Sequence, residues 1–275
     1  MVTLAATAAD LNFMNDQIIG LQHWLNSPLG QYLLAWERQQ FDLAVADVFG
    51  FHALQLGLSE IDALAANRMP HRWLACQAPQ TRAHLVTEFS ALPFPANSLD
   101  LVVLPHALEL SPDPHATLRE VERVLVPEGR AIITGLNPLS LWGLRQRRVR
   151  AYQKLGLAQS FLPQNEFIGY LRLRDWVRLL GFEVEVGRFG CYRPTFQSGR
   201  WLERMDWMDH AGARWWHIFG AAYFLVAVKR VRGVTLLSPN WKAARVAQRA
   251  PVSVANSAVL SGPKKSEDDN KRSLH

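Results

Sequence analysis

The sequence is poor in cysteine and has no long apolar run. Only two cysteines, Cys76 and Cys191, occur among its 275 residues. Two are too few for the disulfide framework of a secreted protein or for a cysteine-rich zinc site. The longest unbroken apolar run, Ile218–Val228, contains Gly220 and is 11 residues long, whereas a helix needs about 20 such residues to cross a bilayer. The first ten residues have no basic residue ahead of their apolar stretch, so we do not expect a signal peptide. We expect a soluble protein of a reducing compartment, most simply the cytoplasm.

Two chemical signatures are also missing. The histidines have no cysteine or carboxylate beside them at the spacing of zinc ligands. Three serines near the ends of apolar runs, Ser90, Ser98 and Ser111, do not stand in the sequence context of a nucleophile elbow. We therefore expect neither a bound metal nor a nucleophilic hydrolase.

Charge is distributed unevenly along the chain. Residues 1–138 hold 7 basic and 14 acidic residues, residues 139–226 hold 13 and 7, and residues 227–275 hold 10 and 3. A blanket basic coat would indicate nucleic acid, but this pattern is an asymmetry between two parts of a fold plus a basic tail. It favours a solvated face with a solubilising tail. The alternative is an anionic substrate or partner that meets the basic half.

Apolar periodicity predicts three parts of the chain. Residues 1–40 have apolar residues at helical spacing, interrupted at Ser27-Pro28, and predict a helical N-terminal extension. Residues 41–232 alternate strand-sized apolar runs with helical or turn-rich stretches, which is typical of a parallel sheet with helices on both faces. Residues 233–275 have no apolar period and are expected to be largely disordered.

The clearest local prediction is a strand–helix–strand unit over Leu99–Thr134. Asp113 is suited to cap the helix, and Pro114 fits its first position, where no backbone donor is required. Its inward face is formed by four residues: Leu118, Val121, Val124 and Leu125. The helix is expected to stop at Pro127-Glu128-Gly129, with the next strand directly after it. The crossover between the two strands is expected to be right-handed.

Two phrases in and beside this unit resemble a known family. Leu92–Val103, LPFPANSLDLVV, resembles the approach to the fourth strand in class I S-adenosylmethionine-dependent methyltransferases of the type-11, small-molecule subgroup. Arg119–Gly129, REVERVLVPEG, resembles the turn before that family's fifth strand, and Arg174–Phe182 resembles the helix before its sixth. The resemblance covers roughly residues 50–232. It implies a Rossmann-like, doubly wound, mostly parallel α/β sheet of about seven strands, with S-adenosylmethionine as cofactor.

The resemblance also assigns cofactor-binding positions, several of which depart from the family pattern. The family's first strand ends in an acid followed by three spaced glycines, and here those positions are Gln55, Gly57, Ser59 and Ile61. Glycines at such a loop let the backbone approach a ligand. The acid that binds the ribose at the end of the second strand corresponds to Gln77, whose hydrogen bond would lack charge assistance.

Further candidates lie near later strand ends. Glu88 and Phe89 correspond to the adenine side of the family's site. His106 follows the fourth strand at the carboxyl edge, where open α/β sheets bind ligands, and a neutral imidazole there could act as a general base. Packing of His106 against the following helix is the alternative. Glu109 either orients that ring or faces solvent, which we favour. Asn137 follows the fifth strand, but no catalytic role is carried onto it.

Two segments after the fifth strand have more than one interpretation. Residues 139–150 join an apolar stripe to four arginines. They form either an ordinary surface helix or a helix that binds an acidic substrate, a membrane surface or RNA phosphates. A dense aromatic group could line an acceptor pocket, but packing roles are favoured for most of its members: Trp201, Trp207, Trp215, Trp216 and Phe219.

The leading functional prediction is methyl transfer from S-adenosylmethionine to an unidentified small-molecule acceptor, and an anionic acceptor is the alternative that the basic half leaves open. The altered residues Gln55, Ser59, Ile61 and Gln77 motivate an alternative, a methyltransferase-fold scaffold without productive cofactor binding. An RNA-binding or RNA-modifying protein is the third hypothesis, and no stable membrane insertion is expected.

Overall fold

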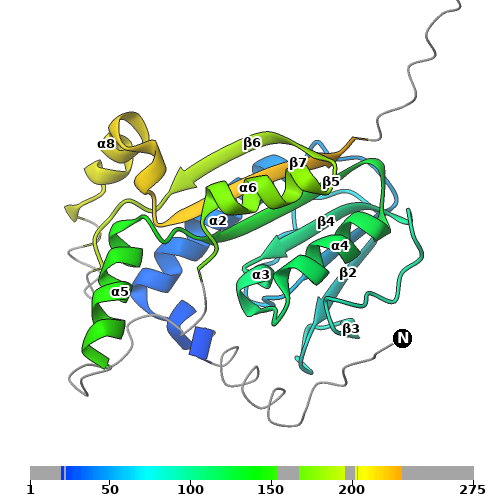
Figure 1. The fold of residues 1–275 in the computed structure, drawn as a ribbon, viewed down its shortest axis with the longest axis horizontal. Coiled ribbons are helices and arrows are strands. Elements are labelled where there is room, and N and C mark those ends of the chain that lie inside the picture. The colour runs from blue at the N-terminus through cyan, green and yellow to red at the C-terminus, as the bar shows by residue number, and fades with distance from the viewer. Residues whose placement is uncertain (1–19, 22, 154–166, 196–201, 203, 231–275) are drawn as a thin grey trace, which may run out of the picture. The chain divides into compact units, whose positions relative to one another are not determined.

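A computed structural model describes residues 20, 21, 23–153, 167–195, 202 and 204–230. Figure 1 shows the described part as a twisted sheet with helices on both faces. The strands are β1 His52–Leu56, β2 His71–Cys76, β3 Leu85–Val86, β4 Leu99–Pro105, β5 Leu125–Leu136, β6 Phe182–Gly190 and β7 Ala222–Lys229. The helices are α2 Pro28–Val45, α3 Ala107–Leu110, α4 Pro114–Val124, α5 Leu141–Gln153, α6 Tyr170–Leu179, α8 Trp207–Trp215 and the 3-10 helix η1 His217–Phe219.

The seven strands form one sheet in the order β3-β2-β1-β4-β5-β7-β6. Neighbours from β3 to β5 are parallel, and β7 pairs antiparallel with both β5 and β6. The carboxyl ends of β1, β2 and β4 therefore share one edge with the start of β7. This arrangement confirms the predicted Rossmann-like, mostly parallel α/β fold.

Two apolar layers cover the two faces of the sheet. On one face, α4 and α6 contribute Leu118, Val121 and Leu173 to a core that includes Leu54 and Val102. On the other face, α2 packs with the residues after β1, and the members of this second core include Leu33, Phe41, Leu58, Ile61 and Val103. Figure 1 shows α4 and α6 in front of the sheet and α2 behind it. Successive side chains of each strand point to opposite faces of the sheet, so each strand contributes residues to both layers.

Helix α2 starts where the sequence predicts a break. The Ser27 hydroxyl accepts a hydrogen bond from the Gly30 amide at 3.1 Å, and Pro28 occupies the first turn. The helix then runs to Val45, beyond the predicted boundary at residue 40, and its apolar face is part of the domain core. Most of the first predicted helix, including Leu11 and Met14, lies outside the described residues.

The strand–helix–strand unit from β4 to β5 forms as predicted, but its helix ends earlier: α4 stops at Val124, and Leu125, predicted on the helix, is the first residue of β5. The Asp113 carboxylate accepts from the Ala116 amide at 2.9 Å, Pro114 is the first residue of α4, and the buried side chains of α4 include Leu118 and Val121. The connections in the first half of the sheet differ from this unit. Three segments connect its parallel strands, and none of them contains a helix: residues 57–70, 77–84 and 87–98.

The chain divides into two units, Met1–Arg232 and Gly233–His275. All described residues belong to the first unit, so the predicted disordered tail lies outside them. No helix among the described residues combines the length and the apolar character that a membrane crossing requires.

Candidate functional site

A small cleft lies at the carboxyl ends of β1 and β2. Its lining residues come from both strand ends, from the segment after β3 and from α3: Gly57, Leu58, Cys76, Gln77, Gln80, Phe89 and Leu110. The volume is about 10 Å³, which holds about one water molecule. Three of the predicted cofactor residues, Gly57, Gln77 and Phe89, therefore come together around one space.

Gly57 has a backbone conformation that favours glycine. Its φ is +103°, and a Cβ atom there would lie 3.1 Å from the Pro105 carbonyl oxygen and 3.3 Å from the Ala107 Cβ. Its amide donates to the Ala75 carbonyl at 3.0 Å. Glycine is thus needed here both for its positive φ and for the close approach of the segment after β4.

Gln77 carries an unsatisfied polar atom into this region. The residue is half-buried, and its Oε1 atom is buried without a hydrogen-bond partner among the described residues. The neighbouring Cys76 thiol donates to the Gly57 carbonyl at 3.1 Å, and burial raises the pKa of Cys76 to about 11. A buried carbonyl oxygen without a donor is costly in a native fold, so Oε1 is suited to accept from a bound hydroxyl.

Gln55 has a different role from the one that the family pattern implies. Its side-chain amide donates to the carbonyls of Leu58 and Ile61, both at 2.7 Å, and its Oε1 accepts from the Ala63 amide at 2.9 Å. A carboxylate has no N–H group and cannot donate to two carbonyls. The glutamine therefore holds the helix-free connection after β1 against the sheet.

The remaining predicted cofactor residues are more dispersed. Ser59 is half-buried, its hydroxyl 3.4 Å from the Glu60 carboxylate. With Gln55 and Ile61 it lines a separate pocket of about 610 Å³ beside β2. Glu88 is exposed, so the structure does not bring it together with the cleft residues.

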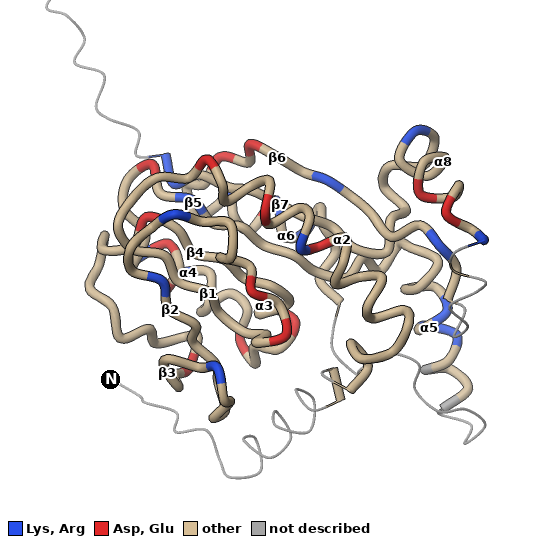
Figure 2. The backbone as a smooth tube through the Cα atoms, turned by 180° about the vertical axis from the view of Figure 1, so that it is seen from behind, with Lys and Arg blue, Asp and Glu red and all other residues tan. Residues whose placement is uncertain are grey.

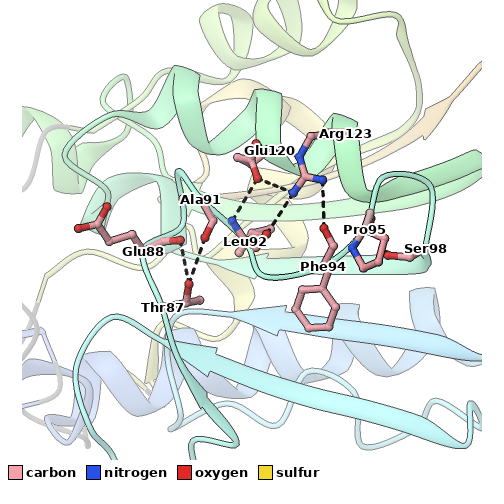
Figure 3. A network of polar contacts seen from close by, with 9 residues as sticks. All are labelled: Thr87, Glu88, Ala91, Leu92, Phe94, Pro95, Ser98, Glu120 and Arg123. Carbon is pink, nitrogen blue, oxygen red and sulfur yellow. Dashed lines mark hydrogen bonds and ion pairs between the residues drawn. The ribbon is translucent and has the colours of Figure 1, made fainter. Parts of the chain in front are cut away.

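The two family phrases contact one another directly (Figure 3). The Arg123 guanidinium donates to the carbonyls of Leu92 and Phe94 at 3.1 and 3.0 Å, and the Glu120 carboxylate accepts from the Leu92 amide at 3.1 Å. Glu120 and Arg123 also pair at 2.8 Å, and the hydrogen bond from Arg123 lowers the pKa of Glu120. These contacts fix the segment that brings Phe89 into the cleft.

His106 lies at the end of β4 in a buried charged cluster. Its Nδ1 is 2.8 Å from Glu109 Oε2 and its Nε2 is 2.9 Å from Glu37 Oε1, and all three side chains are buried. Glu109 also accepts from the Leu136 amide at 2.6 Å, which joins the cluster to the end of β5. Glu109 therefore orients the ring, and the favoured prediction that it faces solvent is wrong.

Burial and charge act in opposite directions on His106. Burial lowers the pKa of His106. The charges of Glu37 and Glu109 and their hydrogen bonds raise it by more than burial lowers it, and the resulting pKa is about 10. The ring therefore lies between two carboxylates, an environment that favours its protonated form. The general-base role of His106 stays a prediction, and it requires a neutral ring, because a protonated imidazole has no lone pair to accept a proton.

Glu37 was not predicted as a member of this cluster. It lies four residues after Leu33 and four before Phe41, which places a carboxylate on the apolar face of α2. That position is the signal that the sequence offers, because an acid is seldom buried without a partner. Only the packing of α2 on the sheet identifies His106 as the partner.

The segments after β5 combine anchored and exposed aromatic side chains. Asn137 donates to the carbonyls of Ile218 and Gly220 at 2.6 and 2.9 Å, and Trp142 is buried with its Nε1 donating to the Arg193 carbonyl at 2.7 Å. The favoured packing role is wrong for four members of the predicted aromatic group, because their side chains are exposed: Trp207, Trp215, Trp216 and Phe219. Trp201 lies outside the described residues.

No group of three or more His, Cys, Asp or Glu residues suited to a metal ion occurs within the ranges that the structure describes.

Comparisons with known proteins agree with this fold. Residues 52–133 match the model of a family described as a methyltransferase domain. The chain is 34% identical over 217 residues to the uncharacterized protein YafS of Escherichia coli, covering 78% of this chain and 82% of that protein. It is 30% identical over 183 residues to the biotin biosynthesis bifunctional protein BioHC of Saccharophagus degradans, covering 64% of this chain but only 32% of that longer protein.

Solved structures show the same architecture. One is a complex between the Trm112 methyltransferase activator of Haloferax volcanii and a methyltransferase, with a TM-score of 0.53 and 16% identity over 78% of this chain and 97% of that one. Another is an S-adenosylmethionine-dependent methyltransferase of Thermotoga maritima, with a TM-score of 0.50 and 14% identity over 72% and 92% of the two chains. These two structures show the fold alone. The family model over residues 52–133, together with the glycine after β1 and the paired phrases around β4 and α4, leads to one conclusion: the chain belongs to the class I S-adenosylmethionine-dependent methyltransferases of type 11, an enzyme family.

Proposed function

We propose that this protein transfers a methyl group from S-adenosylmethionine to a small-molecule acceptor at the carboxyl edge of β1, β2 and β4. The observation that carries the proposal is the unpartnered, buried Oε1 of Gln77 next to Gly57. An uncharged carbonyl oxygen at the end of β2 is suited to accept from a ribose hydroxyl. Crevices at this edge are where open α/β sheets bind ligands.

The residues around the cleft match the chemistry of that cofactor. Gly57 permits close backbone approach, Gln77 offers the acceptor, and the Phe89 ring supplies an apolar wall for a planar base. The cofactor supplies a methyl group that is already activated by a positively charged sulfur. The cleft must widen to admit a nucleoside, because its volume is only about 10 Å³.

The acceptor needs orientation more than activation, since effective alignment of the reacting groups removes most of the barrier to such a displacement. In this proposal the pair of Glu37 and Glu109 holds the protonated His106 at the end of β4, directly beside Gly57 through Pro105 and Ala107. His106 is thus a positioning residue that fixes the edge on which the acceptor binds.

Calorimetric titration and thermal melting, each with S-adenosylmethionine and with its demethylated product, test the proposal. In the melts, a ligand at 100 times its dissociation constant adds about 2.7 kcal/mol of stability, which raises the melting temperature of a domain of this size by about 5–10 °C. Gln77→Ala is expected to weaken binding about fivefold, the effect of one uncharged hydrogen bond.

The matched control is Gln39→Ala, which removes an exposed glutamine from α2 and should leave binding unchanged. Absence of binding at millimolar ligand, with a cooperative melt, would reject the proposal. That result would favour a scaffold protein in which Gln55 and its loop keep the fold without the cofactor.

A further inference from the structure

Exposed apolar side chains are concentrated at one end of the molecule. Fifteen large apolar residues are exposed in the described part of the chain, and nine of them lie in two short segments, residues 139–152 and 207–219. A contiguous exposed apolar patch on a soluble domain marks a binding surface more often than scattered single residues do. The two segments therefore need a common explanation.

The first segment presents a basic amphipathic helix. Helix α5 contains no acidic residue, and its arginines Arg147 and Arg148 are exposed beside exposed leucines. Figure 2 shows basic positions along α5 without acidic ones. A groove of about 420 Å³ runs along the helix, and most of its lining is apolar: Leu141, Leu144, Arg145, Arg148, Val149 and Tyr152.

The second segment exposes seven consecutive residues, 213–219, four of which are large apolar side chains. Trp215 is 74% exposed and Trp216 is 55% exposed. Their backbone is nevertheless held, because the Trp216 amide donates to the Gly212 carbonyl at 2.9 Å and the Tyr192 hydroxyl donates to the His217 carbonyl at 3.0 Å. The fold therefore holds the backbone of this segment in place while these rings face solvent.

Hydrogen bonds join the two segments. Asn137, just before α5, donates to the carbonyls of Ile218 and Gly220. Arg193 offers its carbonyl to Trp142 of α5 and pairs through its guanidinium with Asp209 of α8 at 2.8 Å. The exposed side chains of α5 and of residues 213–219 thus belong to one structural unit at the carboxyl edge.

We propose that this unit, the α5–η1 surface, docks the protein on an anionic phospholipid bilayer. Tryptophan and phenylalanine rings favour the boundary between headgroups and acyl chains, and aliphatic side chains such as Ile218 and Leu144 reach the acyl region. The exposed arginines of α5 and Arg214 meet the lipid phosphates. The binding is peripheral and does not depend on the cofactor, so it goes beyond the proposed methyl transfer.

Nucleic acid is the competing occupant, and the side chains favour the bilayer. A strand of nucleic acid would engage the arginines and stack on the rings, but it would leave exposed aliphatic residues without a partner: Leu139, Leu141, Leu144 and Ile218. A bilayer satisfies both the aliphatic and the basic residues.

Cosedimentation of the full chain with phosphatidylcholine vesicles, with and without phosphatidylglycerol, tests the proposal. We expect binding that requires phosphatidylglycerol and weakens with salt. Trp215→Ser with Trp216→Ser should reduce partitioning by about tenfold or more, because two interfacial aromatic side chains are lost. Arg147→Glu with Arg148→Glu should reduce it by a similar factor.

Each double variant has a matched control away from the surface. Phe49→Ser with Phe51→Ser removes two exposed aromatic rings before β1, and Arg119→Glu with Arg178→Glu reverses two exposed charges on α4 and α6. Both controls should bind vesicles like the parent chain. Thermal melts of all variants establish that they fold.

Three outcomes would overturn the proposal: no binding of the parent chain to anionic vesicles, equal loss in the controls, or tight salt-dependent binding of RNA without vesicle binding. Titration of the same preparations with the demethylated cofactor product separates this result from the proposed function, because either binding can fail while the other persists.

Discussion

The two halves of the sheet are built in different ways. From β4 to β5, a capped helix crosses between parallel strands, and its apolar face packs on the sheet. From β1 to β3, the connections have no helix, and the side chain of Gln55 holds the first of them through three hydrogen bonds. The first connection is held by the apolar face of a helix, whereas the second combines buried apolar side chains such as Ile61 with the buried amides of Gln55 and Asn67. Local damage should therefore have different consequences in the two halves.

The largest effect is expected from Glu109→Ala, at the charged cluster of the β4–β5 half. The change leaves the Leu136 amide and His106 Nδ1 without their acceptor in a buried site. Removing one partner of a buried ion pair costs about 3–5 kcal/mol of unfolding free energy. Urea unfolding measures the loss, and Glu88→Ala, which removes an exposed carboxylate, should change stability little.

In the other half, Gln55→Glu should cost about 2–3 kcal/mol, because it leaves buried carbonyls unpaired and turns a carboxylate toward them. Gln39→Glu, the same change on the exposed side of α2, should be near neutral. Equal unfolding free energies for the two variants would show that the amide of Gln55 does not hold the connection after β1.

The pH dependence of stability reports on the same charged cluster. Since folding raises the pKa of His106 to about 10, the folded state binds the proton more tightly than the unfolded state. The stabilisation is therefore complete below pH 6.5, the ordinary value, and is lost as the pH rises toward 10, by at most about 1.4 kcal/mol per pH unit.

Nitrogen NMR of the imidazole measures this titration directly. The ring of His106 should stay protonated at pH 8, and Glu37→Gln should shift its titration to lower pH because one of the two carboxylate charges is removed. A ring that is neutral at pH 7 would contradict this expectation and support the general-base role predicted for His106.

The smallest effect is expected for Arg123→Lys, which keeps the charge but loses the planar group that reaches both Leu92 and Phe94. The side chain is about one third exposed, so solvent screening limits the loss to about 1 kcal/mol. Chemical unfolding should detect it, and Arg119→Lys, on the exposed side of α4, is the matched control. A larger loss than in Gln55→Glu would reverse the comparison between the two halves.

The sequence by itself determined the parts of this protein that depend on local patterns. The periodicity of α4, its cap at Asp113 and the apolar runs of β1, β4, β5 and β7 predicted the sheet because these signals lie within a few residues of one another. The same holds for the phrases that identified the methyltransferase family. The sequence also singled out Gly57, and the structure gives it a positive φ, for which glycine has few alternatives.

Only the tertiary structure decided the roles of the polar side chains. It turned Gln55 toward its own loop and left Gln77 Oε1 without a hydrogen bond among the described residues. It also placed Glu37 of α2 against His106, across a long sequence separation. Likewise, it buried Trp142 and exposed Trp215, although both are tryptophans of short helical segments. Hydrogen-bond partners, burial and the resulting pKa depend on which elements pack together in space. The periodicity of a single segment does not determine which elements pack together.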